Sequence, residues 1–247
     1  MKVLVTRPVE RAPATIKALA SHCIIAVCEP MLVLRPVSAA AIRPRQFQAL
    51  LITSMGAAEI LGSTVSDRSV TIYAVGDATA HTVRERGFYN VRSAGGDVSN
   101  LFDLVKQSSD PLGGPLLHVG SDEVAGDLVD RLRVHGFCAE RVVIYQMQEA
   151  VRFSEHTLVA FQKKEIEAVL FFSPRSARTF EKLFSLQQRP IILDDVSVFC
   201  LSRAIAQEIN QIGWSEVVVC QKPTMTSLIS SVVAFFPSLV QEQNAER

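Results

Sequence analysis

The sequence has no excess of either charge and no long apolar run. Its 25 Lys and Arg residues are matched by 25 Asp and Glu residues, so nothing indicates a surface for nucleic acid or for an anionic membrane. No apolar stretch reaches the roughly 18 residues of a membrane span. The first strand-like run begins at Lys2, which leaves no room for a signal peptide. We therefore expect a cytoplasmic protein without nucleic-acid or membrane partners.

The sequence also lacks the short motifs of several enzyme classes. It contains no GxGxxG, GxxxxGK[ST], GxSxG or CxxC pattern, which argues against nucleotide binding, α/β-hydrolase chemistry and zinc. Most of the five cysteines fall in apolar strands or at helix ends, which predicts buried reduced thiols rather than a metal or redox site. They are Cys23, Cys28, Cys138, Cys200 and Cys220.

Aromatic residues are scarce, at 7%, although apolar residues make up 48% of the chain. Runs of small aliphatic residues are typical of parallel strands that are buried on both faces. These runs alternate with amphipathic segments, which predicts an α/β fold with right-handed crossovers. The predicted helices include 12–21, 55–62, 78–86, 98–107, 122–135, 154–162, 175–184, 202–211 and 224–235.

The clearest positive feature is an internal repeat. The segment ALLITSMGAAEIL at 49–61 is echoed by AVLFFSPRSARTF at 168–180. The segment TIYAVGDATAHTVRERGF at 71–88 is echoed by SVFCLSRAIAQEINQIGW at 197–214, and DVSNLFDLV is echoed by TMTSLISSVV. Two related α/β domains carry equivalent polar turns, which predicts a binding or catalytic site in a cleft between them.

The repeat does not divide the chain into simple halves. The middle block, 38–143, contains five predicted strands, whereas the C-terminal block lacks the first two strands of the pattern. Residues 1–33 contain a strand-helix-strand piece of that kind. We therefore predict a discontinuous outer domain, made of 1–33 and 150–247, into which 38–143 is inserted. The crossings at 34–37 and 144–149 are extended, and we expect them to pair as antiparallel connector strands.

Seven segments, in their order and spacing, are similar to the uroporphyrinogen-III synthase family. They are VLVTRP, ITS before a helix, YAVGDATAHTVRERGF, LHVGSD, VVIYQ, LFFSPRSA and KPTMTSLISSV, and they extend over nearly the whole chain. The resemblance implies two flavodoxin-like parallel-sheet α/β domains joined by a two-stranded β connector. It also implies an enzyme of tetrapyrrole and heme biosynthesis that cyclises hydroxymethylbilane to uroporphyrinogen III. Such enzymes invert ring D through a spiro intermediate and use no cofactor or metal.

The same resemblance implies the partners of the chain. The small-molecule partner would be the substrate hydroxymethylbilane. We expect a monomer, with transient contact to the enzyme that precedes it in the pathway.

The predicted substrate-binding residues lie in polar turns at the carboxyl ends of strands. Because the implied substrate carries acetate and propionate groups on its four pyrroles, free N–H groups at helix N-termini would attract it. Any one of these hydroxyls is better explained as an ordinary N-cap, and it is the whole set at the carboxyl ends of strands that favours a binding role. Arg7 is the best carboxylate ligand, although a surface salt bridge fits its position as well. The predicted residues are Thr6, Arg7, Thr53, Ser54, Gly76, Thr79, Gly120, Ser121, Ser173, Ser176 and Thr224.

Tyr145 is the predicted catalytic residue. The reaction needs a hydroxyl group to leave the terminal carbon of the bilane, and the pyrrole nitrogens drive the later steps. Tyr145 lies in the second crossing and matches the tyrosine of the family's VYQ pattern, and a phenol is protonated at neutral pH and can donate. The alternative is an aromatic residue that only packs the connector. Tyr73 and Tyr89 lie in strand contexts and are predicted to be core residues, as is His118.

One turn departs from the family pattern. The second repeat has SRAI at 202–205, where the first keeps Gly76 and Thr79. Losing the glycine puts a close backbone approach in doubt, and losing the hydroxyl groups removes donors. Two other interpretations stay open. One is a non-catalytic two-domain binding protein for a small anionic ligand, and the other is a regulatory or interaction domain that kept the fold.

Overall fold

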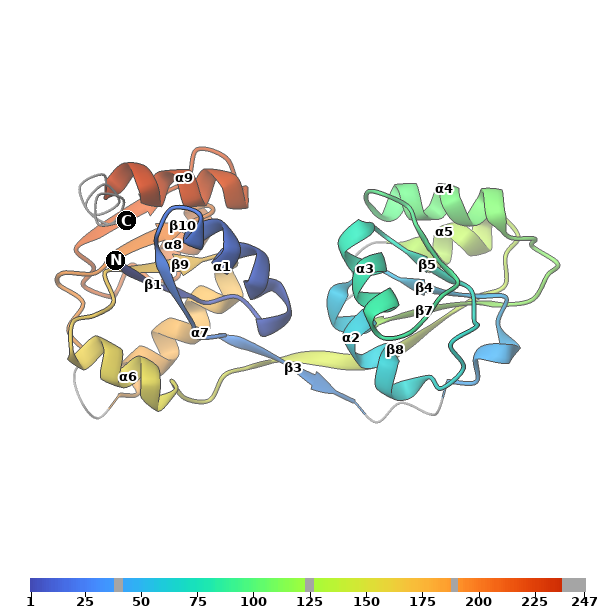
Figure 1. Ribbon diagram of the computed structural model, residues 1–247, viewed down its shortest axis with the longest axis horizontal. Coiled ribbons are helices and arrows are strands. Elements are labelled where there is room, and N and C mark those ends of the chain that lie inside the picture. The colour runs from blue at the N-terminus through green and yellow to red at the C-terminus, as the bar shows by residue number, and fades with distance from the viewer. Residues whose placement is uncertain (38–41, 123–126, 188–190, 237–247) are drawn as a thin grey trace. The chain divides into compact units, whose positions relative to one another are not determined.

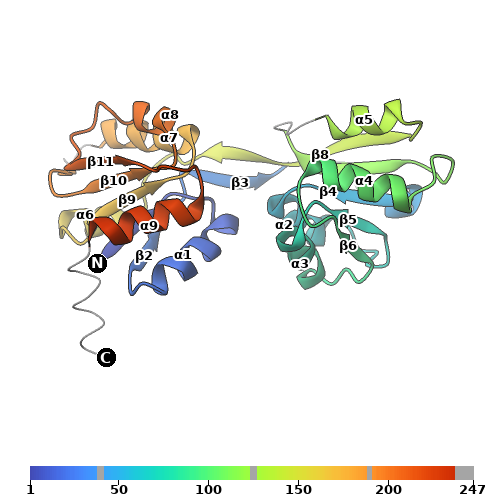
Figure 2. The same ribbon diagram turned by 90° about the horizontal axis from the view of Figure 1, so that it is seen from above.

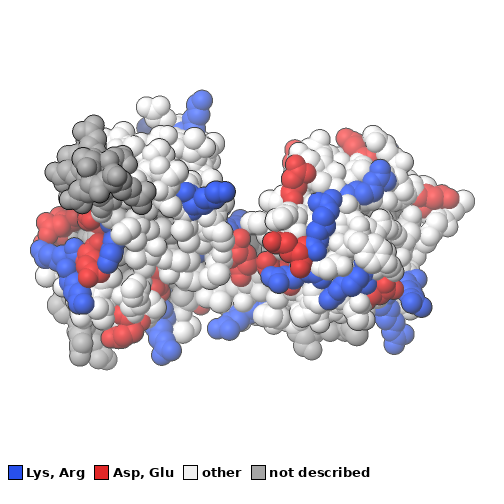
Figure 3. Space-filling model, viewed as in Figure 1, with Lys and Arg blue, Asp and Glu red and all other residues white. Residues whose placement is uncertain are grey.

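The computed structural model describes residues 1–37, 42–122, 127–187 and 191–236. The chain forms two compact units, which we call unit 1 (Met1–Val33 and Gln148–Arg247) and unit 2 (Leu34–Met147). Each unit contains a β-sheet with helices on both faces (Figure 1). Basic and acidic side chains are interspersed over the surface seen in Figure 3, in keeping with the zero net charge. None of the described helices has the length and apolarity needed to span a membrane.

Unit 2 is built on a six-stranded sheet in the order β3-β8-β7-β4-β5-β6. Helices α2 and α3 contribute to the apolar core on one face, and α4 and α5 to the core on the other (Figure 2). The strands are β3 (Leu32–Pro36), β4 (Ala49–Ile52), β5 (Ile72–Ala74), β6 (Val91–Ser93), β7 (Leu116–Ser121) and β8 (Ala139–Glu149). The helices are η2 (Pro44–Gln46), α2 (Met55–Thr64), α3 (Asp77–Glu85), α4 (Val98–Ser108) and α5 (Leu128–Val134).

Unit 1 is built on a five-stranded parallel sheet in the order β11-β10-β9-β1-β2. Helices α6, α7 and α8 share one apolar core, whereas α1 and α9 share the core on the opposite face. The strands are β1 (Lys2–Val5), β2 (Ile25–Cys28), β9 (Ala168–Phe171), β10 (Ser197–Cys200) and β11 (Glu216–Val219). The helices are η1 (Val9–Arg11), α1 (Ala12–Ala20), α6 (Glu155–Gln162), α7 (Pro174–Ser185), α8 (Arg203–Gln207) and α9 (Met225–Phe235).

The two sheets have matching strand orders. The run β6-β5-β4-β7-β8 in unit 2 corresponds to β11-β10-β9-β1-β2 in unit 1, so the internal repeat is a repeat of tertiary structure. The parallel α/β class predicted from the sequence is confirmed. In each unit the strand order reverses at one point, between β4 and β7 or between β9 and β1. The carboxyl ends of strands at such a point are the usual ligand-binding position of this class.

Strands β3 and β8 run side by side (Figures 1 and 2). The N–H of Val37 donates to the carbonyl of Ile144 at 3.0 Å, and that of Ala150 donates to the carbonyl of Met31 at 2.9 Å. Because the residue number rises on one strand as it falls on the other, the two strands are antiparallel. The first part of β8 pairs parallel with β7, so one strand belongs both to the sheet of unit 2 and to the two-stranded connector.

Two predicted helices are shorter than their sequence patterns. The helix expected over 202–211 ends at Gln207. After that residue the N–H groups donate to carbonyls three residues back instead of four, as in the bond from Ile212 to the carbonyl of Ile209 at 3.3 Å. The helix expected over 122–135 begins at Leu128. Part of that stretch, 123–126, lies outside the described residues.

Two predictions of burial are wrong. Tyr89 is 73% exposed rather than part of the core, because it precedes β6 instead of lying within it. Cys138 is exposed for the same reason, since it lies just before β8 begins. Tyr73 is buried as predicted, at 4% exposure, and it lies inside β5.

Because unit 1 and unit 2 have separate apolar cores, core mutations in the two units should have separable effects. Leu4 and Leu50 are both fully buried, but Leu4 lies in a core of unit 1 and Leu50 in a core of unit 2. The chain has one tryptophan, Trp214, which packs against the same core as Leu4. We expect Leu4→Ala to lower the stability reported by Trp214 fluorescence in urea by about 2–5 kcal/mol.

The matched control is Leu50→Ala, which removes the same atoms from the other unit. It should leave the Trp214 transition at the same urea concentration. Far-ultraviolet circular dichroism should instead show that the secondary structure of unit 2 is lost at a lower urea concentration. Equal shifts of the Trp214 transition in both variants would mean that the units unfold as one.

Candidate functional site

The predicted site residues lie at or near the carboxyl ends of strands, in two groups. In unit 2 they are Thr53 and Ser54 after β4, Gly76 and Thr79 after β5, Gly120 and Ser121 at the end of β7, and Tyr145 in β8. In unit 1 they are Thr6 and Arg7 after β1, Ser173 and Ser176 after β9, and Thr224 after β11. The structure therefore brings residues that are far apart in sequence to one edge of each sheet.

Tyr145 is anchored to the first turn of α2. Its hydroxyl oxygen is 2.9 Å from the Oγ of Ser54, and the two groups are hydrogen-bonded. Ser54 is also the N-cap of α2, since its Oγ accepts from the N–H of Ala57 at 3.2 Å. Tyr145 is only 6% exposed. Its hydroxyl therefore lies at the positive end of a helix, in a largely dry environment.

A glycine makes this placement of the ring possible. A Cβ atom on Gly56 would come within 3.0 Å of the Tyr145 Cζ and within 3.1 Å of its hydroxyl oxygen. Such distances are shorter than most real Cβ contacts, so a larger residue at Gly56 would require the ring to shift by a few tenths of an ångström. Gly56 is not among the site residues predicted from the sequence. Its position one residue after the start of a helix was the available signal for a close approach.

A second hydrogen bond joins β4 to β7. The Oγ1 of Thr53 is 2.9 Å from the Nε2 of His118, and a Cβ on Gly120 would lie 3.6 Å from the same nitrogen. Burial, followed by the positive charge of Arg141, lowers the pKa of His118 to about 4. His118 is therefore a neutral imidazole at physiological pH. It is buried and hydrogen-bonded, in keeping with the core residue expected from the sequence.

The end of β7 carries an irregularity beside Tyr145. The register between β7 and β8 shifts between Gly120 and Ser121, so that Ser121 faces Tyr145. The N–H of Asp122 donates to the carbonyl of Tyr145 at 3.3 Å. Bulges of this kind re-aim side chains at the ends of strands. The bulge brings Ser121 beside the residue that the resemblance marks as catalytic.

The remaining two residues of unit 2 lie one strand further along the sheet. Gly76 is the N-cap of α3 and has an extended backbone, with φ −159° and ψ 174°. Thr79 is buried within that helix, at 5% exposure. In unit 1 the matching N-cap, Ser202, has nearly the same backbone angles, φ −154° and ψ 162°. Because any residue adopts this conformation, replacing the glycine by serine imposes no backbone strain.

Arg7 is the main cationic group among the predicted residues of unit 1. Its guanidinium lies 4.6 Å from the centre of the Phe172 ring and donates to the Oγ1 of Thr15 at 3.2 Å. It also contacts the sulfur of Met225, the first residue of α9. Burial, and then the charge of Arg11, lowers the pKa of Arg7. No acidic side chain among the described residues forms an ion pair with Arg7, so the structure gives no support to the salt-bridge interpretation.

The hydroxyl residues of unit 1 differ in how accessible they are. Thr6 is fully buried and donates to the carbonyl of Leu170 at 2.7 Å, which ties the end of β1 to β9. Ser173 caps α7 and is hydrogen-bonded to the buried Ser176. Thr224 caps α9 and is exposed. Thr224 is therefore the exposed residue of this set, while Arg7 and Ser173 are half-buried.

Metal ligands are not clustered in the structure. Over the described ranges, no group of three or more His, Cys, Asp or Glu side chains is arranged to hold a metal ion. The chemistry that these two edges offer is hydrogen-bond donation and positive charge from helix N-termini, Arg7 and the Tyr145 hydroxyl.

The lowered pKa of His118 predicts a pH-dependent stability. Because the folded-state pKa lies below the ordinary value of 6.5, the unfolded chain takes up a proton first as the pH falls. The contribution of the neutral His118 to the free energy of unfolding is therefore present above pH 6.5 and is lost as the pH falls toward 4. Between pH 7 and pH 5 the free energy of unfolding should fall by about 2 kcal/mol more in the parent than in His118→Gln. Urea titrations at both pH values measure this difference, and His156→Gln, at an exposed histidine, is the control. An equal fall in the free energy of unfolding in all three proteins would contradict the prediction.

Comparison with known proteins identifies the family of the chain. Among solved structures, the uroporphyrinogen-III synthetase of Helicobacter pylori 26695 matches with a TM-score of 0.59 and 16% identity, over 95% of this chain and 99% of that one. A mutant uroporphyrinogen III synthase from the extremely thermophilic bacterium Thermus thermophilus matches with a TM-score of 0.45 and 14% identity, over 95% and 98% of the two chains. No curated protein matches the sequence. The family model HEM4, described as uroporphyrinogen-III synthase HemD, matches residues 14–230, and the chain therefore belongs to the uroporphyrinogen-III synthase family.

Proposed function

We propose that this protein cyclises hydroxymethylbilane to uroporphyrinogen III, inverting ring D through a spiro intermediate. The observation that carries the proposal is the family match over 14–230. The reaction is a lyase reaction, in which the bilane loses its terminal hydroxyl group and a new carbon–carbon bond closes the ring. It needs no oxidant or reductant, because the electrons for ring closure come from the pyrroles.

The substrate's carboxylates would bind to the helix N-termini at the edges of the two sheets. Arg7 lies beside the first residue of α9 and has no acidic partner among the described residues, so its charge is available to an anion. Thr224 and Ser54 cap two of the helices that point at these edges. Free backbone N–H groups in the first turns of these helices would add to the binding.

The protein's part in the chemistry would be small but specific. The departing hydroxide needs a proton donor, and the Tyr145 phenol is the candidate, held by Ser54 over Gly56. Burial at 6% exposure keeps bulk water away from it. Holding the bilane folded would favour the spiro route over direct closure to the non-inverted isomer.

Several further features belong to the proposal. We infer that the two units act as separate domains, joined at 34–37 and 144–149, and that each provides its own anion-binding turns. We also infer a monomer that contacts the preceding pathway enzyme transiently. A cytoplasmic location is supported by the free thiols at all five cysteines, since disulfides are rare in that compartment.

The activity itself is the first test. The purified protein should convert hydroxymethylbilane to the type III isomer without added metal or nucleotide, also in the presence of a chelator. The isomers are separated by chromatography after oxidation of the product. Type I product alone, formed at the spontaneous rate, would contradict the proposal and favour a non-catalytic binding protein.

Tyr145→Phe tests the role of the phenol. Turnover should fall by about 10–1000-fold, the range of a lost proton donor or transition-state hydrogen bond. The loss of the bond to Ser54 should cost about 1 kcal/mol of stability. Complete inactivation is not expected, because the pyrroles drive most of the steps.

Two variants separate chemistry from structure in this test. Tyr73→Phe removes the hydroxyl of another buried tyrosine, which donates to the Ser108 carbonyl at 3.1 Å, and it should retain turnover. Ser54→Ala breaks the same hydrogen bond and also the cap of α2, but it keeps the phenol, so it should reduce turnover less than Tyr145→Phe. A Phe variant with parental turnover, and a Tyr145→Ala variant whose activity falls only with its melting temperature, would reduce Tyr145 to a packing residue.

A further inference from the structure

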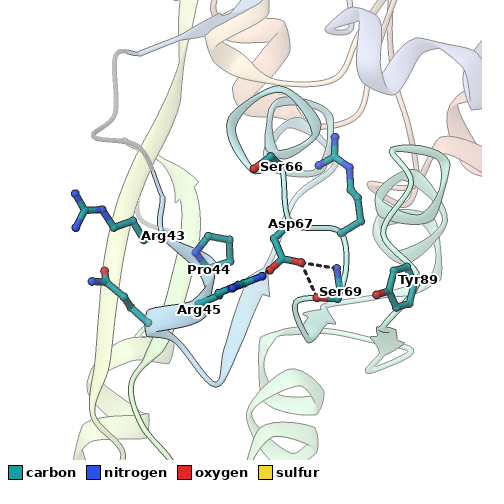
Figure 4. Close-up of a pocket in the computed structure, with 9 residues that line it drawn as sticks. Arg43, Pro44, Arg45, Ser66, Asp67, Ser69 and Tyr89 are labelled. Carbon is teal, nitrogen blue, oxygen red and sulfur yellow. Dashed lines mark hydrogen bonds and ion pairs between the residues drawn. The ribbon is translucent and has the colours of Figure 1, made fainter.

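Unit 2 contains a pocket that the proposed reaction does not use. Its volume is about 840 Å³, within the range of sites for small organic ligands. The residues that matter for its chemistry are Arg43, Arg45, Asp67, Arg68, Ser69 and Tyr89 (Figure 4).

The pocket lies at the edge of the sheet opposite to the predicted substrate-binding residues. Arg43 and Arg45 precede β4, Asp67 and Ser69 precede β5, and Tyr89 precedes β6. These three strands are parallel neighbours, so the pocket is at their amino ends, whereas Thr53 and Gly76 follow their carboxyl ends. A ligand in the pocket is therefore separated from that site by the length of the strands.

One arginine that lines the pocket is bonded to a neighbouring carboxylate. The Nε of Arg45 donates to Asp67 at 3.3 Å, and Asp67 in turn accepts from the N–H of Ser69 at 3.0 Å and from its hydroxyl. These bonds, led by the one from the Ser69 hydroxyl, lower the pKa of Asp67. The Arg45 side chain remains 91% exposed. Its two terminal nitrogens thus stay available to a phosphate or carboxylate, and the bond from Nε restrains the side chain.

The other two arginines have different roles. Arg68 donates to the carbonyls of Val65 and Gly62 and lies over the Phe88 ring at 4.5 Å, so it mainly builds the wall. Arg43 is exposed and forms no ion pair within the described part of the chain. With one carboxylate against three guanidinium groups, the pocket has an excess of positive charge.

Tyr89 provides an aromatic surface at the other end. It is 73% exposed, although large apolar rings are normally buried. In Figure 4 its ring lies beyond Ser69, while Arg43 lies at the opposite end, with Arg45 and Asp67 between them. A ligand that contacts both Tyr89 and Arg45 must therefore be elongated, with a ring at one end and a negative charge at the other.

We propose that this pocket binds a nucleoside monophosphate, with the phosphate on Arg45 and the base stacked on Tyr89, while Arg43 adds positive charge nearby. The absent GxGxxG and P-loop motifs do not bear on this mode, because those motifs use backbone N–H groups, whereas here side chains recognise the ligand. The site is independent of the cyclisation reaction.

Isothermal titration calorimetry with adenosine 5′-monophosphate, adenosine and inorganic phosphate tests the proposal at low salt. The nucleotide should bind at one site, and each half of it should bind at least about 10-fold more weakly, because stacking and ion pairing both contribute. Tyr89→Ala and Arg45→Gln should each weaken nucleotide binding by about 10-fold, while Tyr89→Phe keeps the ring and should retain it. Arg152→Gln is the matched control, since Arg152 is exposed and lies outside the pocket.

The outcomes separate this proposal from the proposed function. The pocket variants should keep the melting temperature and the conversion of hydroxymethylbilane, since their side chains are exposed and touch no predicted substrate-binding residue. The proposal is overturned by no binding at about 5 mM nucleotide, by equal affinity for nucleotide and phosphate, or by binding that Arg7→Gln abolishes and Arg45→Gln does not. None of these results bears on whether the protein makes the type III isomer.

Discussion

The insertion of β1 between β2 and β9 is the constraint on which unit 1 depends. The pairs Val3–Ala168 and Val3–Ala26 place the first strand of the chain inside a sheet whose other side is formed by β9, β10 and β11, from the other end of the sequence. Leu4 packs into the core on one face, and Val3 and Val5 pack into the core on the other. Neither core is complete until this long-range pairing has formed, which is entropically the most costly step of such a topology.

The same strand positions the cationic part of the candidate site. Thr6 fastens the end of β1 to the carbonyl of Leu170, and Arg7 follows directly. Because β1 and β9 are adjacent, Arg7 reaches the Phe172 ring and the first residue of α9. The packing of a hydrophobic strand thereby determines where one guanidinium is placed, and the buried Thr6 acts through structure rather than through contact with a ligand.

Unit 2 uses the corresponding adjacency for a different purpose. The pairing of β4 with β7 brings Thr53 to His118, and the bulge between β7 and β8 turns Tyr145 toward Ser54. The result is an edge at which uncharged side chains bond to one another, with the guanidinium of Arg141 close to His118 and bonded to the Ser121 carbonyl. The repeat therefore preserved the scaffold while the two edges diverged, as the change from Gly76 to Ser202 also illustrates: the backbone angles match and only the side chain differs.

The sequence alone determined the α/β class, the repeat, most element boundaries and the turns in which candidate residues fall, because hydrophobic periodicity and capping residues act over short stretches of chain. It also pointed to Tyr145 through a short motif. Helix ends without a strong stop signal were less predictable, as at Gln207, where the pattern continued but the hydrogen bonding changed.

The tertiary structure decided which turns meet and which side chains are exposed. Gly56 under the Tyr145 ring, the Thr53–His118 bond and the exposure of Tyr89 all depend on strand order and on where a strand begins. Those properties arise from contacts between segments distant in sequence, so local sequence patterns do not predict them. The arginine-lined pocket is of the same kind, since its walls come from three loops that only the parallel pairing of β4, β5 and β6 brings together.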